Sequence, residues 1–116
     1  MYTILFHLVL IFQLGNHIQQ KALLRGKWVN LDDSHFKIEF RETSYCWFYN
    51  KDTVASGTYT WSHQSCDTSY YKGPDRTLEF IRLNDGSCYE ITGLTKQNLS
   101  YRYTVNGKLH RFKRWK

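Results

Sequence analysis

Apolar and polar residues alternate with a period of two through most of this 116-residue chain, and this pattern constrains the fold more than any other feature. In HFKIEFR, residues 35–41, Phe36, Ile38 and Phe40 share one side of an extended backbone, and charged residues occupy the other. Successive side chains of a strand point to opposite faces, so the pattern is typical of half-buried strands. No segment after residue 25 has a helical period. The alternation therefore indicates an all-β domain.

The same alternation predicts about eight short strands separated mostly by short turns. Turn-forming residues stand at 84–86 and at Asn106 and Gly107. Strands joined by short turns pair antiparallel, and a twisted meander of this number closes into a barrel, which removes its edges. We predict an antiparallel eight-strand up-and-down (meander) barrel. The predicted strands are residues 27–31, 35–41, 45–50, 57–65, 77–83, 87–94, 99–104 and 109–114.

The N-terminal segment differs from the rest of the chain, because residues 1–20 contain no Asp, Glu, Lys or Arg. Its core, ILFHLVLIFQL at residues 4–14, is shorter than the roughly 20 apolar residues of a membrane-spanning helix and matches the apolar region of a secretory signal. No Lys or Arg precedes it and no Ala-x-Ala site follows it. We predict that residues 1–22 are an export signal or an apolar N-terminal helix, that residues 23–116 form the barrel, and that the protein is secreted or periplasmic without a transmembrane span.

The cysteines are Cys46, Cys66 and Cys88, an odd number that leaves at least one thiol unpaired within the chain. An exported protein could form one disulfide from this set, and the sequence does not fix the pairing. There is no C-x-x-C motif, and His63 lacks a second pair of ligands nearby. We therefore predict no metal site and no cofactor.

The positive charge gathers at the C-terminus. The formal net charge is +6, and KLHRFKRWK, residues 108–116, holds five basic residues and no acid. Such an end can bind nucleic acid or an anionic surface. The alternative, which we favour here, is a terminal strand whose charges discourage edge-to-edge pairing.

The two ends of the predicted barrel carry matching motifs. GKW, residues 26–28, opens the first strand, and Arg114 lies in the last strand, which is a neighbour of the first in a closed barrel. This arrangement resembles the calycin superfamily, and is most similar to small bacterial lipocalin-like domains. The resemblance implies that Trp28 packs under a basic side chain from the chain's end, Arg114 or, as the second candidate, Arg111, while Gly26 permits the close approach. Tryptophan offers a guanidinium its best ring face. The chain is much shorter than larger lipocalins and has no room for a helix after the barrel.

The predicted inward face is rich in aromatic residues, consistent with Trp 4, Tyr 9 and Phe 7 in the composition. The inward set is Trp28, Phe36, Ile38, Phe40, Trp47, Tyr59, Trp61, Leu78, Phe80, Tyr89, Ile91, Tyr101 and Tyr103. One interpretation is a pocket for a flat or apolar ligand, oriented by a few polar groups. The alternative is that these side chains fill a narrow barrel. The predicted ligand-binding residues are Phe40, Trp47, Tyr59, Trp61, His63, Tyr89, Tyr101 and Tyr103.

Catalytic and nucleic-acid sites are less well supported. No Ser or Cys is placed with His63 and an acid to form a triad, and Glu39, Glu79 and Glu90 fall on faces predicted to point outward. We predict no catalytic residue. YRY, residues 101–103, is the kind of sequence that stacks on single-stranded nucleic acid, but the period of two buries both tyrosines. Nucleic acid is therefore not the expected partner.

These observations predict an exported lipocalin-like binding module for a small apolar or aromatic ligand. The alternative is a secreted protein-interaction or inhibitor domain with a filled barrel, which would act through loop 66–76. A third hypothesis is a calycin-fold enzyme that uses His63 inside a cavity. Loops 51–56 and 66–76 are expected to rim the barrel, and the volume of its interior separates the first two hypotheses.

Overall fold

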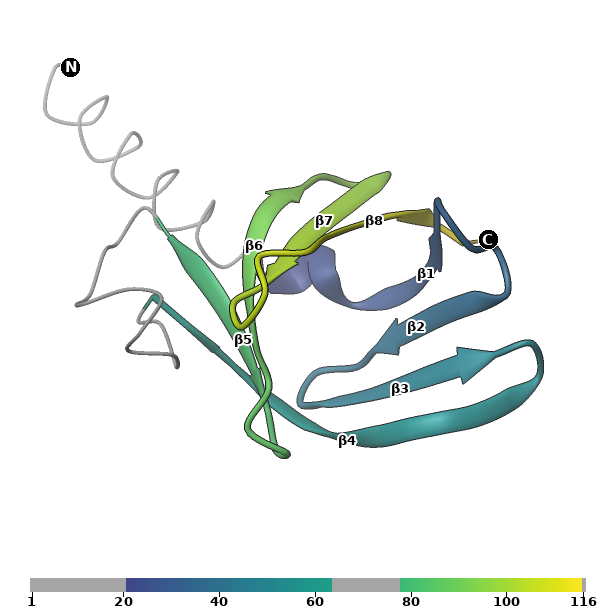
Figure 1. Cartoon of the computed structure of the whole chain (residues 1–116), viewed down its shortest axis with the longest axis horizontal. Coiled ribbons are helices and arrows are strands. Elements are labelled where there is room, and N and C mark those ends of the chain that lie inside the picture. The colour runs from purple at the N-terminus through teal and green to yellow at the C-terminus, as the bar shows by residue number, and fades with distance from the viewer. Residues whose placement is uncertain (1–20, 64–77, 116) are drawn as a thin grey trace, which may run out of the picture.

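The computed structural model describes residues 21–63 and 78–115, and it is an eight-strand barrel (Figure 1). A short helical turn at residues 21–24 precedes the first strand. Each strand pairs antiparallel with the next, and β8 pairs with β1, which closes the barrel and confirms the predicted fold class. The strands are β1 (Gly26–Asn30), β2 (Phe36–Phe40), β3 (Ser44–Tyr49), β4 (Asp52–Ser62), β5 (Glu79–Leu83), β6 (Cys88–Leu94), β7 (Asn98–Tyr103) and β8 (Leu109–Arg114).

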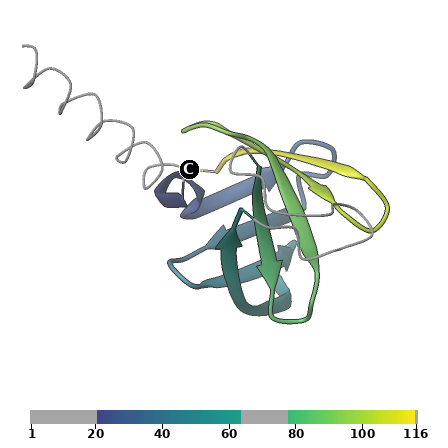
Figure 2. The same ribbon diagram turned by 90° about the vertical axis from the view of Figure 1, so that its left-hand side faces the viewer.

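The connections alternate between the two ends of the barrel, because consecutive strands run in opposite directions. We call one end the hairpin rim; it carries the β1–β2, β3–β4, β5–β6 and β7–β8 connections. The other end is the terminal rim, which carries the helical turn and the end of β8. Figure 2 shows the helical turn and the C-terminal end of the chain on one side of the barrel and the β7–β8 turn on the other.

The core is the barrel interior. The most deeply buried side chains include Trp28, Ile38, Leu99 and Phe112, which come from four different strands. Leu24 of the helical turn joins this cluster, and its carbonyl oxygen accepts a 2.9 Å hydrogen bond from Trp28 Nε1. The turn therefore covers the interior at the terminal rim and satisfies an indole donor that would otherwise be buried without a partner.

Strand β4 is longer than predicted and corrects the expectation of a loop at residues 51–56. It begins at Asp52, so the β3–β4 connection is only Asn50 and Lys51. Asn50 adopts φ 57°, a left-handed conformation that Asn tolerates better than most residues. Trp47 pairs with Ala55 and Phe48 pairs with Thr53, so one residue of β4, Val54, is extra at this bulge. The period-two pattern did not reveal this register shift.

Strand β5 has the opposite phase from the one predicted. Ile81 pairs with Trp61, and Leu83 pairs with Tyr59, so Ile81 and Leu83 face the interior. Phe80 is on the other face together with Leu78, although it is only 1% exposed. Adjacent apolar residues at 80 and 81 fit either phase, and cross-strand pairing decides between them.

The phase of β5 also corrects the prediction for Glu79. Its neighbour across the sheet is Ile91, and it shares the inner phase of Ile81 rather than the outer face. Trp61 Nε1 donates a hydrogen bond to Glu79 Oε2, which gives this inward carboxylate a partner.

Two of the three cysteines lie in the described part of the chain. Cys46 is a free thiol, and Cys88 is disulfide-bonded. Segment 1–20 and loop 66–76 lie outside the described residues. Within the described residues, no helix has the length and apolar character needed to span a bilayer.

Candidate functional site

The terminal rim is closed by a stacked pair from the first and last strands. Arg114 and Trp28 are cross-strand partners, and the Arg114 guanidinium carbon lies 3.8 Å from the centroid of the Trp28 ring. Arg111, the second candidate for this role, is 59% exposed and lies 3.8 Å from Asp32 in an ion pair on the outer face. The structure therefore places Arg114, and not Arg111, over the tryptophan.

Arg114 also connects three separate segments of the backbone. Its Nη2 and Nη1 atoms donate to the carbonyl oxygens of Leu23 and Arg25, at 2.7 and 2.8 Å. Its Nε atom donates to the Lys96 carbonyl oxygen at 3.0 Å. Burial lowers the pKa of this guanidinium, which nevertheless stays charged at neutral pH.

Gly26 makes this arrangement sterically accessible. Its φ is +123°, where residues with a β-carbon are strained. A β-carbon at this position would lie 2.6 Å from Arg114 Nη1. The absence of a side chain at Gly26 thus leaves the space in which the Arg114 guanidinium stacks on Trp28.

The interior toward the hairpin rim is filled by rings in mutual contact. Tyr89 occupies the centre of this cluster, with ring centroids 4.8 Å from Tyr101, 5.2 Å from Tyr103 and 6.3 Å from Trp47. Tyr101 also contacts Phe112 at 5.2 Å. Most of these pairs are tilted or edge-to-face, the arrangements that aromatic rings prefer. The cluster is therefore a packed aromatic core.

The interior leaves little free space among these rings. A void of about 10 Å³ is lined by Phe40, Trp47, Ile81, Leu83, Tyr89 and Tyr101. A single water needs about 10–15 Å³, and drug-sized ligands occupy pockets of about 300–1,000 Å³. Four of the predicted ligand-binding residues thus meet at one place, but the space between them holds at most one water.

The other predicted residues are distributed along the barrel. Tyr59 joins the cluster through Phe40, at 5.4 Å between ring centroids, and its hydroxyl donates to the Arg41 carbonyl oxygen. His63 directly follows β4, and its Nδ1 atom is 3.0 Å from the Leu78 carbonyl oxygen and 3.7 Å from Glu79 Oε1. Trp61 and His63 therefore belong to a polar group around Glu79, separate from the tyrosine cluster.

The aromatic cluster is electrically neutral near pH 7. Burial raises the pKa of Tyr89 to about 12 and that of Tyr101 well above its usual value. Burial and then the charge of Lys108 lower the pKa of His110, whose ring lies 5.4 Å from Tyr101. Burial therefore favours the uncharged forms of Tyr89, Tyr101 and His110.

Exposed apolar side chains, which the period-two pattern does not indicate, lie around the cluster at the hairpin rim. Among the described residues, six large apolar side chains stay exposed, and five of them are at or near this rim. These five are between 44% and 69% exposed: Leu31, Tyr49, Val54, Val105 and Leu109. The available signal was apolar residues at turn positions, such as Leu31 before two aspartates and Val105 before Asn-Gly.

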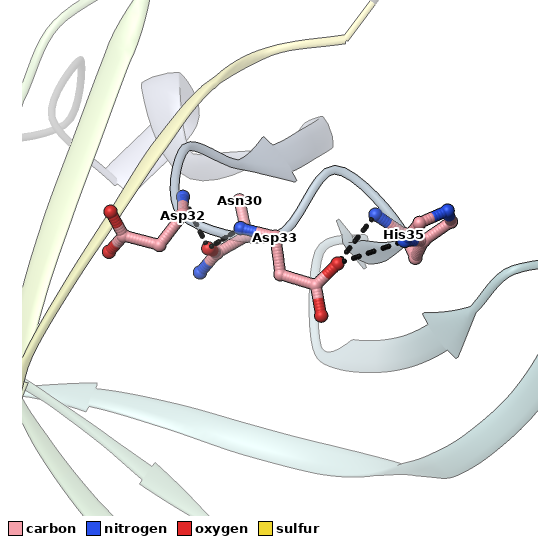
Figure 3. Close-up of polar contacts among 4 residues, drawn as sticks. All are labelled: Asn30, Asp32, Asp33 and His35. Carbon is pink, nitrogen blue, oxygen red and sulfur yellow. Dashed lines mark hydrogen bonds and ion pairs between the residues drawn. The ribbon is translucent and has the colours of Figure 1, made fainter.

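The loop that carries Leu31 is held by side-chain hydrogen bonds to its own backbone (Figure 3). Asn30 Oδ1 accepts hydrogen bonds from the backbone N–H groups of Asp32 and Asp33, both at 2.8 Å. Asp33 Oδ1 accepts a third, from His35 N at 3.0 Å, and this contact lowers the pKa of Asp33. In addition, Leu31 N donates to the Arg111 carbonyl oxygen, so the loop lies beside the start of β8, which carries Leu109. Leu31 is therefore presented by an ordered loop.

Comparisons with protein-family models, curated proteins and solved structures found no match to this chain. Within the described residues, no group of three His, Cys, Asp or Glu side chains is placed to hold a metal ion. In the part of the chain that the structure describes, the site is defined by its own geometry: packed aromatic rings in the interior, the Arg114–Trp28 contact at the terminal rim, and exposed apolar side chains at the hairpin rim.

Proposed function

We propose that this chain is a binding module of calycin type, without catalysis of its own, that recognises a partner protein at the hairpin rim. The partner would contribute apolar or aromatic side chains that cover Leu31, Leu109 and their neighbours. The observation that carries the proposal is the gathering of five of the six exposed large apolar side chains at or near one end of the barrel. Scattered exposed apolar residues are ordinary, but a group at one end is typical of an interaction site.

Two further features support recognition by surface contact. The Asn30 and Asp33 hydrogen bonds hold the Leu31 loop in one conformation, which lowers the entropy lost on binding. Tyr49, at the end of β3, adds an exposed aromatic ring to the rim, and aromatic residues are enriched in protein interfaces. Among the described residues, the void of about 10 Å³ between these rings gives a ligand no room unless the rings rearrange. The filled-barrel alternative is therefore favoured over an internal ligand.

A small flat ligand is the second candidate, and one observation favours it. The Nε1 atom of Trp47 is buried and has no hydrogen-bond partner among the described residues. Trp47 also lines the small void, and buried donors without an acceptor are rare. A ligand with a carbonyl or ring-nitrogen acceptor would satisfy this donor if Tyr89 or Tyr103 changed rotamer.

The calycin assignment and export complete the proposal. The contact of Arg114 with Trp28 supports calycin-type closure, as the resemblance implies. The disulfide at Cys88 supports an oxidising compartment, and therefore a secreted or periplasmic location with residues 1–22 as the export signal. The mass of the protein recovered after export tests whether residues 1–22 are a cleaved export signal. Loss of about the first 22 residues is expected, and an uncleaved chain in the cytoplasm would contradict it.

The binding site is tested by NMR with two kinds of probe. Peptides selected from a randomised display library on the wild-type protein are one probe, and indole is the other. We expect the peptides to be rich in apolar residues, to shift the amide signals of Leu31, Tyr49 and Leu109, and to bind at least tenfold more weakly to Leu31→Ser/Leu109→Ser. Thr60→Ser, on an exposed position of β4, is the control and should bind like wild type.

The same spectra separate the two candidates. If indole shifts the Trp47 Nε1–H signal and the peptides do not shift the amide signals of the hairpin rim, the small-ligand function is correct. If neither probe changes the rim or the Trp47 signal, the hairpin rim is not a binding site and the proposal fails.

A further inference from the structure

The outer face of β1, β2 and β8 presents lysines around an exposed tryptophan, and we call Lys27, Lys37, Lys113 and Trp115 the basic face. Cross-strand pairing places Lys37 and Lys113 on either side of Val29, so they occupy one row across three strands. Lys27 is on the same outer face of β1, and the Trp115 backbone N–H donates to its carbonyl oxygen at 2.9 Å. Lys27 and Trp115, near opposite ends of the barrel domain in sequence, thus lie on one surface.

The lysines of this face have no acidic partner among the described residues. Glu39 is the single acid within β1, β2 and β8; it is the cross-strand neighbour of Lys27, but its ion pair is with Arg41, at 3.8 Å. Asp32, in the adjoining loop, pairs with Arg111. The three lysines outnumber the one acid of this face, and the cross-strand neighbours of Lys37 and Lys113 carry no charge, so net positive charge is available to an external anion.

Trp115 holds two of these charges close together. The Nζ atoms of Lys37 and Lys27 lie 4.5 and 5.2 Å from the centroid of its ring. Each contact is a favourable cation–π interaction, but the two ammonium groups repel each other. An anionic group bound between them would relieve that repulsion.

Protection of a sheet edge does not explain these charges. That interpretation requires a strand with an unpaired side, whereas β8 pairs with β7 on one side and with β1 on the other. The barrel has no edge at β8 to protect. The basic residues of β8 therefore call for another role.

We infer that the basic face binds an anionic phospholipid bilayer and orients the barrel on it. Lysines near such a surface are attracted by its negative potential, and indole rings favour the headgroup level of the interface. The face combines these two groups on the convex outside of the barrel. Single-stranded nucleic acid is the less favoured partner, because stacking needs several free aromatic faces, and Trp115 already carries two lysines.

The test is co-sedimentation of the full chain with vesicles of phosphatidylcholine and phosphatidylglycerol, with pure phosphatidylcholine vesicles as the baseline. The baseline removes any contribution of the apolar N-terminal segment to binding. Each lysine contributes about fivefold to affinity, so Lys27→Gln/Lys37→Gln/Lys113→Gln should bind anionic vesicles roughly a hundredfold more weakly. Binding of the wild type should also fall steeply as salt rises to about 0.5 M.

A matched variant separates a defined face from net charge alone. Lys51→Gln/Arg82→Gln/Lys108→Gln removes the same charge from exposed positions outside β1, β2 and β8, and should keep most of the wild-type binding. Trp115 fluorescence should shift to the blue on anionic vesicles, and Trp115→Phe should lose that shift.

Two outcomes would overturn the inference. Equal loss in the two triple variants would show that binding follows net charge and not this face. Binding of a single-stranded oligonucleotide through the same lysines, without binding to anionic vesicles, would assign the face to nucleic acid.

Discussion

The guanidinium of Arg114 lies 3.8 Å from the ring centroid of Trp28, and this contact joins the last strand of the barrel to the first. It closes the end of the interior opposite the exposed apolar rim. Five of the six exposed large apolar side chains of the described residues lie at or near the opposite end, the hairpin rim. Arg114 combines stacking on Trp28 with three hydrogen bonds to the backbone. We therefore expect its replacement to lower the free energy of unfolding more than it weakens binding at the hairpin rim.

Replacement of Arg114 tests the closure directly. Arg114→Ala should lower the free energy of unfolding by roughly 3 kcal/mol, because a charge-assisted hydrogen bond contributes about 1.5–3 kcal/mol and stacking on Trp about 0.5–2 kcal/mol, without full additivity. Urea denaturation followed by circular dichroism measures the change. Arg114→Lys should restore little of it, because an ammonium cannot replace the planar fork.

A variant on the same strand controls for loss of positive charge. Arg111→Ala removes an exposed side chain whose ion pair with Asp32 is 3.8 Å long, and should cost less than about 1 kcal/mol. If Arg111→Ala and Arg114→Ala cost the same, the closure described for Arg114 is wrong.

Gly26 should be the glycine least tolerant of a side chain among those with positive φ. Gly26→Ala combines φ +123° with a β-carbon 2.6 Å from Arg114 Nη1, so we expect a loss of about 2–4 kcal/mol. Gly107→Ala has φ +71° and open space around the β-carbon, so it should cost only about 1 kcal/mol. The difference between their thermal midpoints checks this prediction, and equal midpoints would contradict it.

Alkaline pH should destabilise the barrel through its buried tyrosines. Burial raises the pKa of Tyr89 from 10 to about 12, and raises that of Tyr101 well above its usual value. Their contribution to stability is therefore complete below pH 10 and is lost as the pH rises through 10 toward 12 and beyond, where the unfolded chain ionises first. Absorbance at 295 nm should show late-ionising tyrosines whose titration coincides with unfolding. Complete ionisation near pH 10 with an intact circular dichroism spectrum would show that these hydroxyls are not buried.

The cysteines should differ in reactivity. A thiol reagent should modify Cys46, which is partly exposed and free, in the folded protein. Reduction of the disulfide at Cys88 should lower stability by about 2–4 kcal/mol. Cys46→Ser should abolish thiol labelling with little loss of stability. If labelling persists in that variant without a reductant, the assignment of the free thiol is incorrect.

The fold was predictable from the sequence because short-range signals agreed with each other. Alternation placed Phe36, Ile38 and Phe40 on one face, and turn residues such as Gly86 separated the strands. Closure also followed, since a meander of eight strands has no other way to remove its edges. The predictions failed where two phases had equal support, at Phe80 and Ile81, and where β4 continues through a bulge at Val54, opposite Trp47 and Phe48.

The candidate site was less predictable, because it depends on volume and exposure. Period two places Tyr89 and Tyr101 on the inner face, but it cannot show that their rings meet at 4.8 Å and fill the space. Leu31 and Leu109 are far apart in sequence, and only the pairing of β1 with β8 brings their segments together. Likewise, the basic residues on the outer face of β8 cannot be explained as edge protection, because β8 pairs with both β7 and β1.

A high-resolution crystal structure of the protein purified from its native host tests the central claim most directly. We predict rings in contact between Trp47 and Tyr101, with at most one water near Trp47 Nε1, and any co-purified partner bound over Leu31, Tyr49 and Leu109. Extended density for a bound molecule inside the barrel, with Tyr89 or Tyr103 displaced to admit it, would contradict a filled barrel and establish an internal ligand instead.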